Sequence, residues 1–413
     1  METTVLIVVY AFVILSFLFE TWMSLLNYRY RNHPIPDEVK DVYDAKEYQK
    51  WHAYNMENFR IQMIVRTIRV VLFVLFLSLS VFVWFNDIAV SLFANNAALQ
   101  VLFFLLLYYL VSFVIGIFVS YYRTFVIEEK YGFNKATKKT FVLDKIKGFV
   151  LTIVFGGGLV YLIYVINDNA GDMFFLYTWL ALVVIFLIVN LIYVRVIVPL
   201  FNKLTPLEDG ELKEAIHTFA NKVGYEVANI SVMDASRRST KLNAFFSGFG
   251  KLKKIVLFDT LIEKMSTDEI VAVLAHEIGH NKHKHIWFNL AQTALMLLVY
   301  IGVFGLVLRN AAFSTAFGFD AANFGFSIIL FIVLIEPLEI LIGLVTSTLS
   351  RRHEYQADRY AATHYGPLHI ETALKVLTRE NFANLTPHPL YVKLRYSHPP
   401  TADRIRAIRK VTS

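Results

Sequence analysis

Seven apolar runs restrict the folds open to this chain more than any other feature. They cover residues 3–25, 62–85, 99–121, 147–167, 173–200, 286–308 and 325–349. Each is long enough to cross the hydrocarbon core of a bilayer, which takes about 20 helical residues. In the first turns of the second run, Arg66 and Arg69 can extend their long side chains to the head groups. The runs predict a mainly α, multi-pass membrane protein with seven spans.

Composition supports this class and excludes several kinds of site. Hydrophobic residues make up 56% of the 413 positions, and the mean hydropathy of +0.50 is beyond that of an ordinary soluble domain. The chain has no Cys, which excludes disulfides, thiolate metal sites and a cysteine nucleophile. The net charge is +7, but its distribution fits membrane topology, so we expect no nucleic-acid partner.

Lysine and arginine are sorted onto alternate loops. Those after the first and third runs are Arg29, Arg31, Lys40, Lys46, Lys50, Arg60, Arg123, Lys130, Lys135, Lys138, Lys139 and Lys145. Residues 86–98 and 167–172, in the loops between, contain neither type. By the positive-inside rule, we expect the N-terminus outside and the C-terminus in the cytosol.

This topology divides the chain into four predicted segments. Residues 1–200 hold five spans with their cytosolic loops, and residues 286–349 hold the other two. Residues 201–285 and 350–413 are polar, fall on the cytosolic side and together are long enough for one small core.

The first polar segment predicts a small α+β arrangement. Helical spacing covers residues 208–223, and short apolar runs at 230–233, 243–246 and 255–258 predict strands. Residues 247–250 predict a turn between the last two strands.

A helix predicted over residues 269–283 carries an H-E-x-x-H motif. Because residues four apart share a helix face, His276 and His280 can present two imidazoles to one metal ion, with Glu277 beside them. Catalytic zinc usually takes three protein ligands and a water molecule, whose pKa falls to about 7. Glu277 would take the proton of that water. A solvated helix turn with two histidines is the alternative until a third ligand is found.

Two histidines just beyond the motif are the nearest candidates for that ligand. His283 and His285 follow His280 along the chain. Three side chains along one helix project in a row and cannot easily converge on one ion. We therefore expect His283 and His285 to belong to a basic cluster at the membrane interface, where the sixth span begins.

The better candidates lie at residues 350–358, beyond the last two spans. If this segment is helical, Glu354 and Asp358 share a face. One carboxylate can then bind zinc while the next turn hydrogen-bonds the distal nitrogen of a ligand histidine. Solvated charge pairs with Arg351 and Arg352 are the alternative, but the H-E-x-x-H motif on the same membrane side favours the metal site.

His398 precedes Pro399 and Pro400 near the C-terminus. A residue before proline is held in an extended backbone, which suits a fixed side chain reaching into a site. If protonated, His398 could stabilise the oxyanion of a tetrahedral intermediate. An isolated histidine is more often a surface or core residue, so this role rests on the accompanying motifs.

Several motifs in matching order resemble the type I CaaX prenyl protease family and its bacterial relatives. They are residues 125–134, Asn243-Ala244-Phe245-Phe246, the H-E-x-G-H core, Arg351-Arg352-x-Glu354-Tyr355-x-Ala357-Asp358 and Ser397-His398-Pro399-Pro400. With the seven spans, the resemblance covers nearly the whole chain. It implies a polytopic membrane protein whose seven helices enclose a chamber, with a small α+β, gluzincin-like zinc protease domain on the cytosolic side.

The resemblance also implies a role for each site residue in a zinc metalloendopeptidase with one Zn²⁺ per chain. The implied residues are the zinc ligands His276, His280 and Glu354, the general base Glu277, the oxyanion-stabilising His398, Asp358, which would orient a ligand histidine, and the substrate-binding Asn243 and Ala244. The last two match the edge strand that binds extended substrate backbone in this family. In the seventh run, Glu336 and Glu339 fit a chamber because carboxylates at membrane depth must face water or a partner.

Family members remove the last three residues of prenylated CaaX proteins, so we expect such substrates, membrane lipid and a monomer. We expect the endoplasmic reticulum membrane in a eukaryote and the cytoplasmic (inner) membrane in a bacterium. Bacteria generally make no prenylated proteins, so a second hypothesis keeps the chemistry but assigns it to quality control of membrane proteins. Prenyl dependence would discriminate between the two.

Two further hypotheses do not involve proteolysis. A di-iron oxidase would use the histidines between residues 276 and 285, but it needs further His-rich boxes and the other eight histidines are scattered. A transporter with a structural metal accounts for the spans and the intramembrane carboxylates, but it leaves Glu277 without a role.

Overall fold

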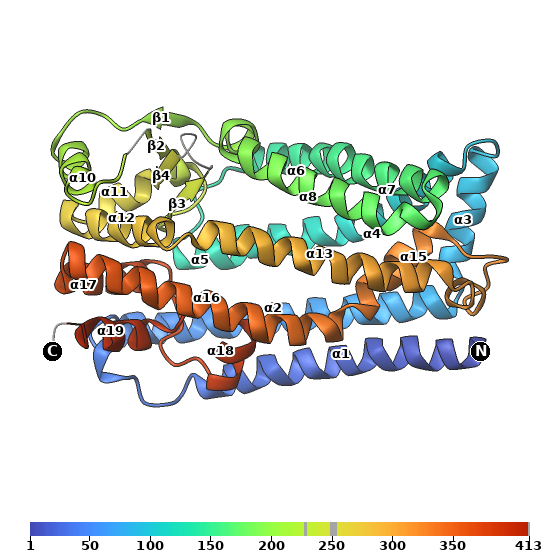
Figure 1. Cartoon of the computed structure of the whole chain (residues 1–413). Helices are drawn as coiled ribbons and strands as arrows, with labels where there is room; N and C mark the ends of the chain where they lie inside the picture. The colour runs from blue at the N-terminus through green and yellow to red at the C-terminus, as the bar shows by residue number, and fades with distance from the viewer. Residues whose placement is uncertain (227–228, 248–253, 412–413) are drawn as a thin grey trace.

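The computed structural model describes residues 1–226, 229–247 and 254–411. Long helices run side by side, and the strands gather at one end of the bundle (Figure 1). Among the described residues, six helical segments are long and apolar enough to cross a membrane, and one bent helix pair gives up to seven. This confirms the prediction of a mainly helical, multi-pass membrane protein.

The spans combine α-helices with short π- or 3₁₀-helical turns. They are α1 (Glu2–Tyr30), α2 (Ala45–Ser78), α4–η2–α5 (Ala97–Tyr122, Arg123–Glu128, Glu129–Tyr131), α6–η3–α7 (Lys138–Leu151, Thr152–Gly156, Gly157–Asn169), η4–α8–η5–α9 (Gly171–Met173, Phe174–Ile192, Tyr193–Ile197, Val198–Phe201), α13 (His285–Arg309) and the bent pair α15 (Phe324–Leu334) and α16 (Glu336–His364). Of the turns, η2, η3 and η5 are π-helical, a local widening of the helix.

Two spans differ from the sequence prediction. The second helix ends at Ser78, because Ser80 adopts a left-handed backbone (φ 53°) and starts a separate helix, α3 (Val81–Leu92). The seventh span bends by 50° between α15 and α16. Pro337 lies in the first turn of α16, where proline has no N–H to continue the preceding helix.

The polar end contains a four-stranded sheet and several helices. Its elements are η1 (Asp37–Val39), β1 (Leu204–Pro206), α10 (Glu211–Lys222), β2 (Ile230–Met233), η6 (Ala235–Arg237), β3 (Ala244–Ser247), β4 (Lys254–Phe258), α11 (Asp259–Lys264), α12 (Thr267–Lys282), α17 (Pro367–Glu380), α18 (Pro389–Arg395) and α19 (Thr401–Arg409), while α14 (Ala312–Thr315) lies in the loop between the last two spans. The strand order is β1-β2-β4-β3, with only β2 and β4 parallel.

The structure confirms the strand predicted at 230–233. The strand predicted at 255–258 is present and begins one residue earlier, at 254. The strand predicted at 243–246 lies one residue later, at 244–247. Part of the turn predicted at 247–250 lies outside the described residues.

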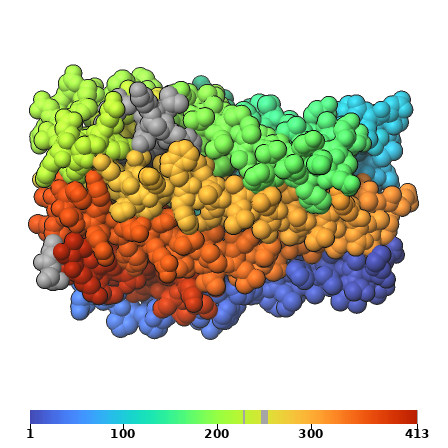
Figure 2. All heavy atoms as spheres, in the orientation of Figure 1, coloured from blue at the N-terminus to red at the C-terminus, as the bar shows by residue number. Residues whose placement is uncertain are grey.

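One apolar core joins distant parts of the chain at this end. It contains buried residues of α10, α12, α17 and α19, together with Val39 and Trp51 from the segment after the first span. The indole N–H of Trp51 donates to the carbonyl of Phe382 at 3.1 Å. The loop after α1 is therefore part of this core. On the face seen in Figure 2, the chain from α16 onward lies between the N-terminal spans and the sheet region.

A cavity of about 790 Å³ lies among α1, α2, α4 and the α15–α16 pair. Glu336 and Glu339 line it, together with Glu20, Arg66 and Arg69. The carboxylates of Glu336 and Glu339 in the seventh span therefore face a partly open cavity. Four of the seven predicted spans line this cavity, and the H-E-x-x-H residues, all of which are described, lie outside its lining.

Candidate metal centre

The helix that carries the H-E-x-x-H motif begins with a reciprocal capping arrangement. Ser266 Oγ accepts from the backbone N–H of Glu269 at 3.3 Å, and Glu269 Oε2 accepts from the backbone N–H of Ser266 at 2.9 Å. These bonds satisfy two otherwise free helix donors. One face of α12 then packs into the core, which fixes the direction in which His276 and His280 project.

Gly279, inside the motif, allows α12 to lie close against α16. A Cβ atom at this position would be 3.0 Å from Ala357 Cα and 3.0 Å from Tyr360 Cβ. Backbone of α16 therefore occupies space that any other residue would need. This close approach brings Glu354, on α16, opposite the two histidines.

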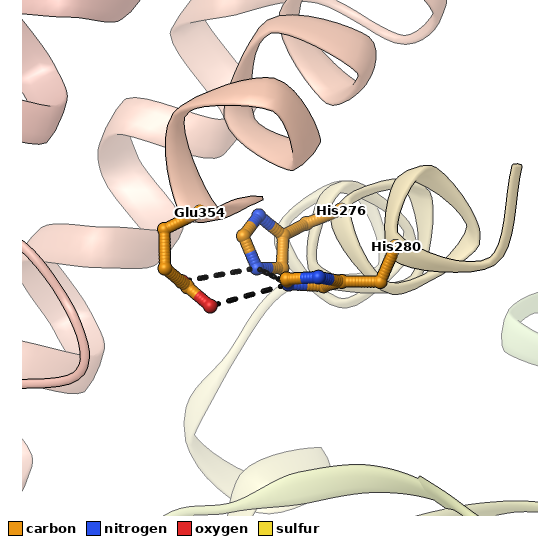
Figure 3. A group of neighbouring side chains, drawn as sticks. All are labelled: His276, His280 and Glu354. Atoms are coloured by element: carbon orange, nitrogen blue, oxygen red, sulfur yellow. Dashed lines mark hydrogen bonds and ion pairs between the residues drawn. The ribbon is translucent and has the colours of Figure 1, made fainter. Parts of the chain in front are cut away.

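Three side chains converge between these helices (Figure 3). The Nε2 atoms of His276 and His280 are 3.1 Å apart. Glu354 Oε1 lies 3.2 Å from Nε2 of His280, and Oε2 lies 3.5 Å from Nε2 of His276. One ligand atom from each residue falls within 4.8 Å of the other two, a spacing that a single metal ion can bridge.

The carboxylate of Glu354 is buried, and one of its oxygens has no hydrogen bond among the described residues. The residue is 4% exposed, and its Oε2 atom accepts no hydrogen bond within the described part of the chain. Near Oε2 lie Nε2 of His276 at 3.5 Å and Nη2 of Arg404 at 3.6 Å, which favour the ionised carboxylate but leave this oxygen without a hydrogen bond from any described residue. The three side chains therefore fit a metal ion both in spacing and in charge.

Asp358 contacts the ring nitrogen of His276 that faces away from Glu354, and it also forms an ion pair with an arginine. Asp358 Oδ1 accepts from His276 Nδ1 at 2.9 Å. Arg404, on α19, donates to both Asp358 oxygens, from Nε at 2.8 Å and from Nη2 at 2.6 Å. The sequence analysis missed Arg404, because it is one of three arginines in a short basic helix. A usable signal was Ile408, a buried residue four positions after Arg404 and therefore on the same face of α19.

The pKa values of two residues in the motif are displaced. Burial alone would lower the pKa of His276, but hydrogen bonds to Asp358 and Glu354 outweigh it and raise the pKa to about 9. A proton on Nε2 then occupies the place that a metal ion would take. Burial raises the pKa of Glu277, against the attraction of the neighbouring histidines. A carboxylate with a raised pKa is suited to proton transfer near neutral pH.

His398 reaches the same group, although 63% of its side chain is exposed. Its Nε2 lies 3.4 Å from Glu354 Oε1, and its Nδ1 lies 2.9 Å from Ser397 Oγ. Desolvation lowers the pKa of His398, despite the opposing attraction of Glu354. This shift favours the neutral ring over the protonated form considered from the sequence. If the Ser397 hydroxyl donates to Nδ1, the proton of a neutral ring is on Nε2, the nitrogen nearer to Glu354.

The expectation for the two histidines after the motif is half wrong. His283 is exposed, as expected for an interfacial residue. His285 is only 4% exposed, and its Nδ1 lies 2.9 Å from Nδ1 of His280. The prediction failed because the helix does not continue: Lys284 has φ 58°, and the chain turns there between α12 and α13.

The two predicted substrate-binding residues lie at β3, the strand at one edge of the sheet. Ala244 begins β3, and Asn243 directly precedes it and is exposed. β3 pairs with β4 on one side and, among the described strands, with none on the other. The strand also contacts α12, which carries the two histidines. An extended peptide could therefore add to this edge beside the metal centre.

Replacing Arg404 by leucine is expected to destabilise the polar end. It leaves the carboxylate of Asp358, which is 0% exposed, without its two-bond donor. Breaking a buried pair in this way costs about 3–5 kcal/mol. Thermal unfolding of the detergent-purified protein measures the loss. Arg406→Leu is the control, because Arg406 is half-exposed and its ion pairs with Glu38 and Asp403 lie nearer the surface, where a pair contributes about 1 kcal/mol. Equal melting temperatures for the two variants would contradict the assignment.

Comparisons with known proteins agree with this geometry. Residues 24–203 match the profile described as CAAX prenyl protease N-terminal, five membrane helices, and residues 206–412 match peptidase family M48. A CAAX prenyl protease 1 homolog of Oryza sativa is 34% identical, covering 98% of this chain and 97% of the relative. CAAX prenyl protease 1 of Saccharomyces cerevisiae is 35% identical, covering 98% and 95%. The human homolog is 33% identical, covering 75% and 74%.

A solved structure extends the similarity to three dimensions. The crystal structure of S. mikatae Ste24p superposes with a TM-score of 0.90 at 35% identity, covering 97% of this chain and 98% of the other. At this identity and coverage, the likeness extends to both the membrane helices and the polar end. The chain therefore belongs to the CAAX prenyl protease family of M48 peptidases and is an integral-membrane metalloprotease.

Proposed function

We propose that this protein is a zinc endopeptidase that removes the last three residues of prenylated CaaX proteins. The observation that carries the proposal is the convergence of His276, His280 and Glu354, with one Glu354 oxygen buried and unbonded among the described residues. Ligand atoms about 2.0–2.2 Å from a tetrahedral zinc ion lie about 3.3–3.5 Å from one another. The two Nε2 atoms are 3.1 Å apart, and the nearest Glu354 oxygens lie 3.2 Å (Oε1) from His280 and 3.5 Å (Oε2) from His276, which is close to this requirement.

Each side chain has a distinct task in the proposed reaction. His276, His280 and Glu354 would hold the zinc ion, which when bound supplies a polarised carbonyl and a water molecule of lowered pKa. Glu277 removes a proton from the attacking water and passes it to the leaving amine. His398, neutral with its proton on Nε2, donates a hydrogen bond to the oxyanion. Asp358, clamped by Arg404, holds the ring of His276 in one tautomer.

Substrate would bind as an added strand. The backbone of Asn243 and Ala244 at the outer edge of β3 offers hydrogen-bonding groups to an extended peptide, and α12 lies next to this edge. The related CAAX prenyl proteases support prenylated peptides as the substrate class. The membrane-embedded helices keep the site close to the bilayer in which a prenyl chain dissolves.

The distribution of basic residues supports an N-terminus outside and a metal centre in the cytosol. The membrane is that of the endoplasmic reticulum in a eukaryote and the cytoplasmic membrane in a bacterium. The protein acts there as a monomer surrounded by lipid.

A farnesylated peptide ending in a CaaX box tests the activity. Detergent-purified, zinc-loaded protein is expected to release the last three residues, which mass spectrometry detects as a defined mass loss. The unprenylated peptide is the matched control, and cleavage of it at an equal rate would remove the prenyl requirement. Cleavage of neither peptide would contradict the proposal and favour a quality-control protease or a transporter with a structural metal.

A further inference from the structure

The Nδ1 atoms of the two motif histidines, which face away from the metal position, contact different groups. Nδ1 of His276 donates to the carboxylate of Asp358, which is paired with Arg404. Nδ1 of His280 instead faces Nδ1 of His285 at 2.9 Å. One ring is thus supported by a charged group and the other by a second imidazole, and no role in the proposed reaction explains the second arrangement.

His285 reaches His280 because the helix breaks between them. Residues five apart in an unbroken helix point about 140° away from each other. Here α12 ends at Lys282, Lys284 takes a left-handed backbone, and α13 begins at His285. The turn directs the His285 side chain back toward the preceding helix, where it is only 4% exposed.

A single arrangement of protons satisfies this chain of rings. If Nε2 of His280 presents a lone pair to a metal ion, its proton must be on Nδ1, which then donates to Nδ1 of His285. His285 must therefore carry its own proton on Nε2. That atom lies 2.8 Å from Oε1 of Gln356, an acceptor. Every donor meets an acceptor, from the exposed amide of Gln356 inward to the metal position.

Neighbouring rings hold His285 in this orientation. His353, on α16, stacks on it with ring centroids 3.9 Å apart and an interplanar angle of 13°. His283 lies nearly parallel to it at 5.5 Å and 15°. Both contacts are with the faces of the ring, so both nitrogen atoms of His285 are left for the bonds at its edge.

We propose that His285, with Gln356 as its acceptor, is a positioning residue that fixes the tautomer and direction of His280. The inference rests on the proposed metal site. Gln356 lies two residues after Glu354 on α16. One helix therefore supplies both a candidate metal ligand, Glu354, and the residue that ends the hydrogen-bond chain orienting the ligand His280. Such outer partners typically contribute about 10–100-fold to metal affinity.

Zinc affinity of the full-length, detergent-purified protein tests the proposal without any peptide. His285→Phe keeps a flat ring for stacking but removes the acceptor, and we expect about 10–100-fold weaker zinc binding in competition with a chromophoric chelator. His285→Gln, which restores an acceptor oxygen, is expected to recover most of the affinity. Gln356→Lys places a donor at Nε2 of His285 and reverses the chain of bonds, so it should weaken zinc binding as well.

His283→Phe is the matched control, because it alters an exposed neighbouring histidine whose ring stacks near His285 and, among the described residues, makes no hydrogen bond to His280. Its zinc affinity and its cobalt absorption spectrum are expected to be unchanged, whereas His285→Phe shifts the spectrum. Unchanged affinity in both His285→Phe and Gln356→Lys would overturn the inference. If His285→Phe does not fold, the exposed Gln356 position decides alone. Zinc binding without peptide cleavage by the unsubstituted chain would overturn the proposed activity and leave this inference standing.

Discussion

Glu277→Gln is expected to retain the metal and to lower peptide cleavage by roughly 10²- to 10⁴-fold, the usual contribution of a general base. Glutamine has nearly the same shape as glutamate, but it cannot accept a proton at neutral pH. Glu277 follows His276 directly on α12, and its partly buried carboxyl has a raised pKa. It is therefore placed and tuned to move a proton beside the candidate metal position.

Two measurements on the same preparation separate this effect from misfolding. Zinc content by elemental analysis should stay at one ion per chain, and only the rate of product formation should fall. Glu263→Gln, which changes an exposed carboxylate on α11, is the control and should behave like the unsubstituted protein. Cleavage by Glu277→Gln at a rate near that of the control would exclude Glu277 as the base.

Glu354→Ala is expected to remove the metal itself. Two imidazoles from one helix then remain without the carboxylate that completes the set, so zinc affinity should fall by more than the roughly 10–100-fold typical of an outer partner. The purified variant should carry little zinc and no activity. Glu380→Ala, at the end of α17, provides a carboxylate control away from the centre.

The metal dependence has its own readout. Equilibrium dialysis at a fixed free zinc concentration compares occupancy of the two variants and the unsubstituted protein. Added zinc should restore part of the binding, because the histidines are still in place. Full occupancy of Glu354→Ala at a zinc concentration that only just saturates the unsubstituted chain would remove Glu354 from the proposed ligand set.

The fold was predictable where the sequence pattern is local. Span positions follow from apolar runs of about 20 residues, and the strands at 230–233 and 255–258 follow from short apolar runs between polar residues. Two backbone events were not predictable in this way. Ser80 and Lys284 adopt left-handed conformations that end helices, although neither residue is a glycine or a proline, the residue types that usually mark such breaks.

The candidate site was predictable only in part, for a related reason. The spacing of His276 and His280 is encoded within one helix, and so is that of Glu354 and Asp358, although spacing alone leaves open which carboxylate faces the metal. Arg404 reaches Asp358 only through the packing of α19 against α16. His285 reaches His280 only through a turn. Contacts that depend on tertiary packing leave no periodic trace in a single sequence.

The candidate centre is also divided along the chain, because the last two spans lie between its halves. His276 and His280 precede α13, whereas Glu354 and Asp358 lie in the second half of α16, and His398 and Arg404 follow α16. A nascent chain that has completed the motif still lacks every one of these later groups. The last two spans, α13 and α15 with the first half of α16, separate these halves along the chain. With the proposed ligand set, metal binding and proteolysis therefore require that the last two spans have been synthesised and folded back on the first half.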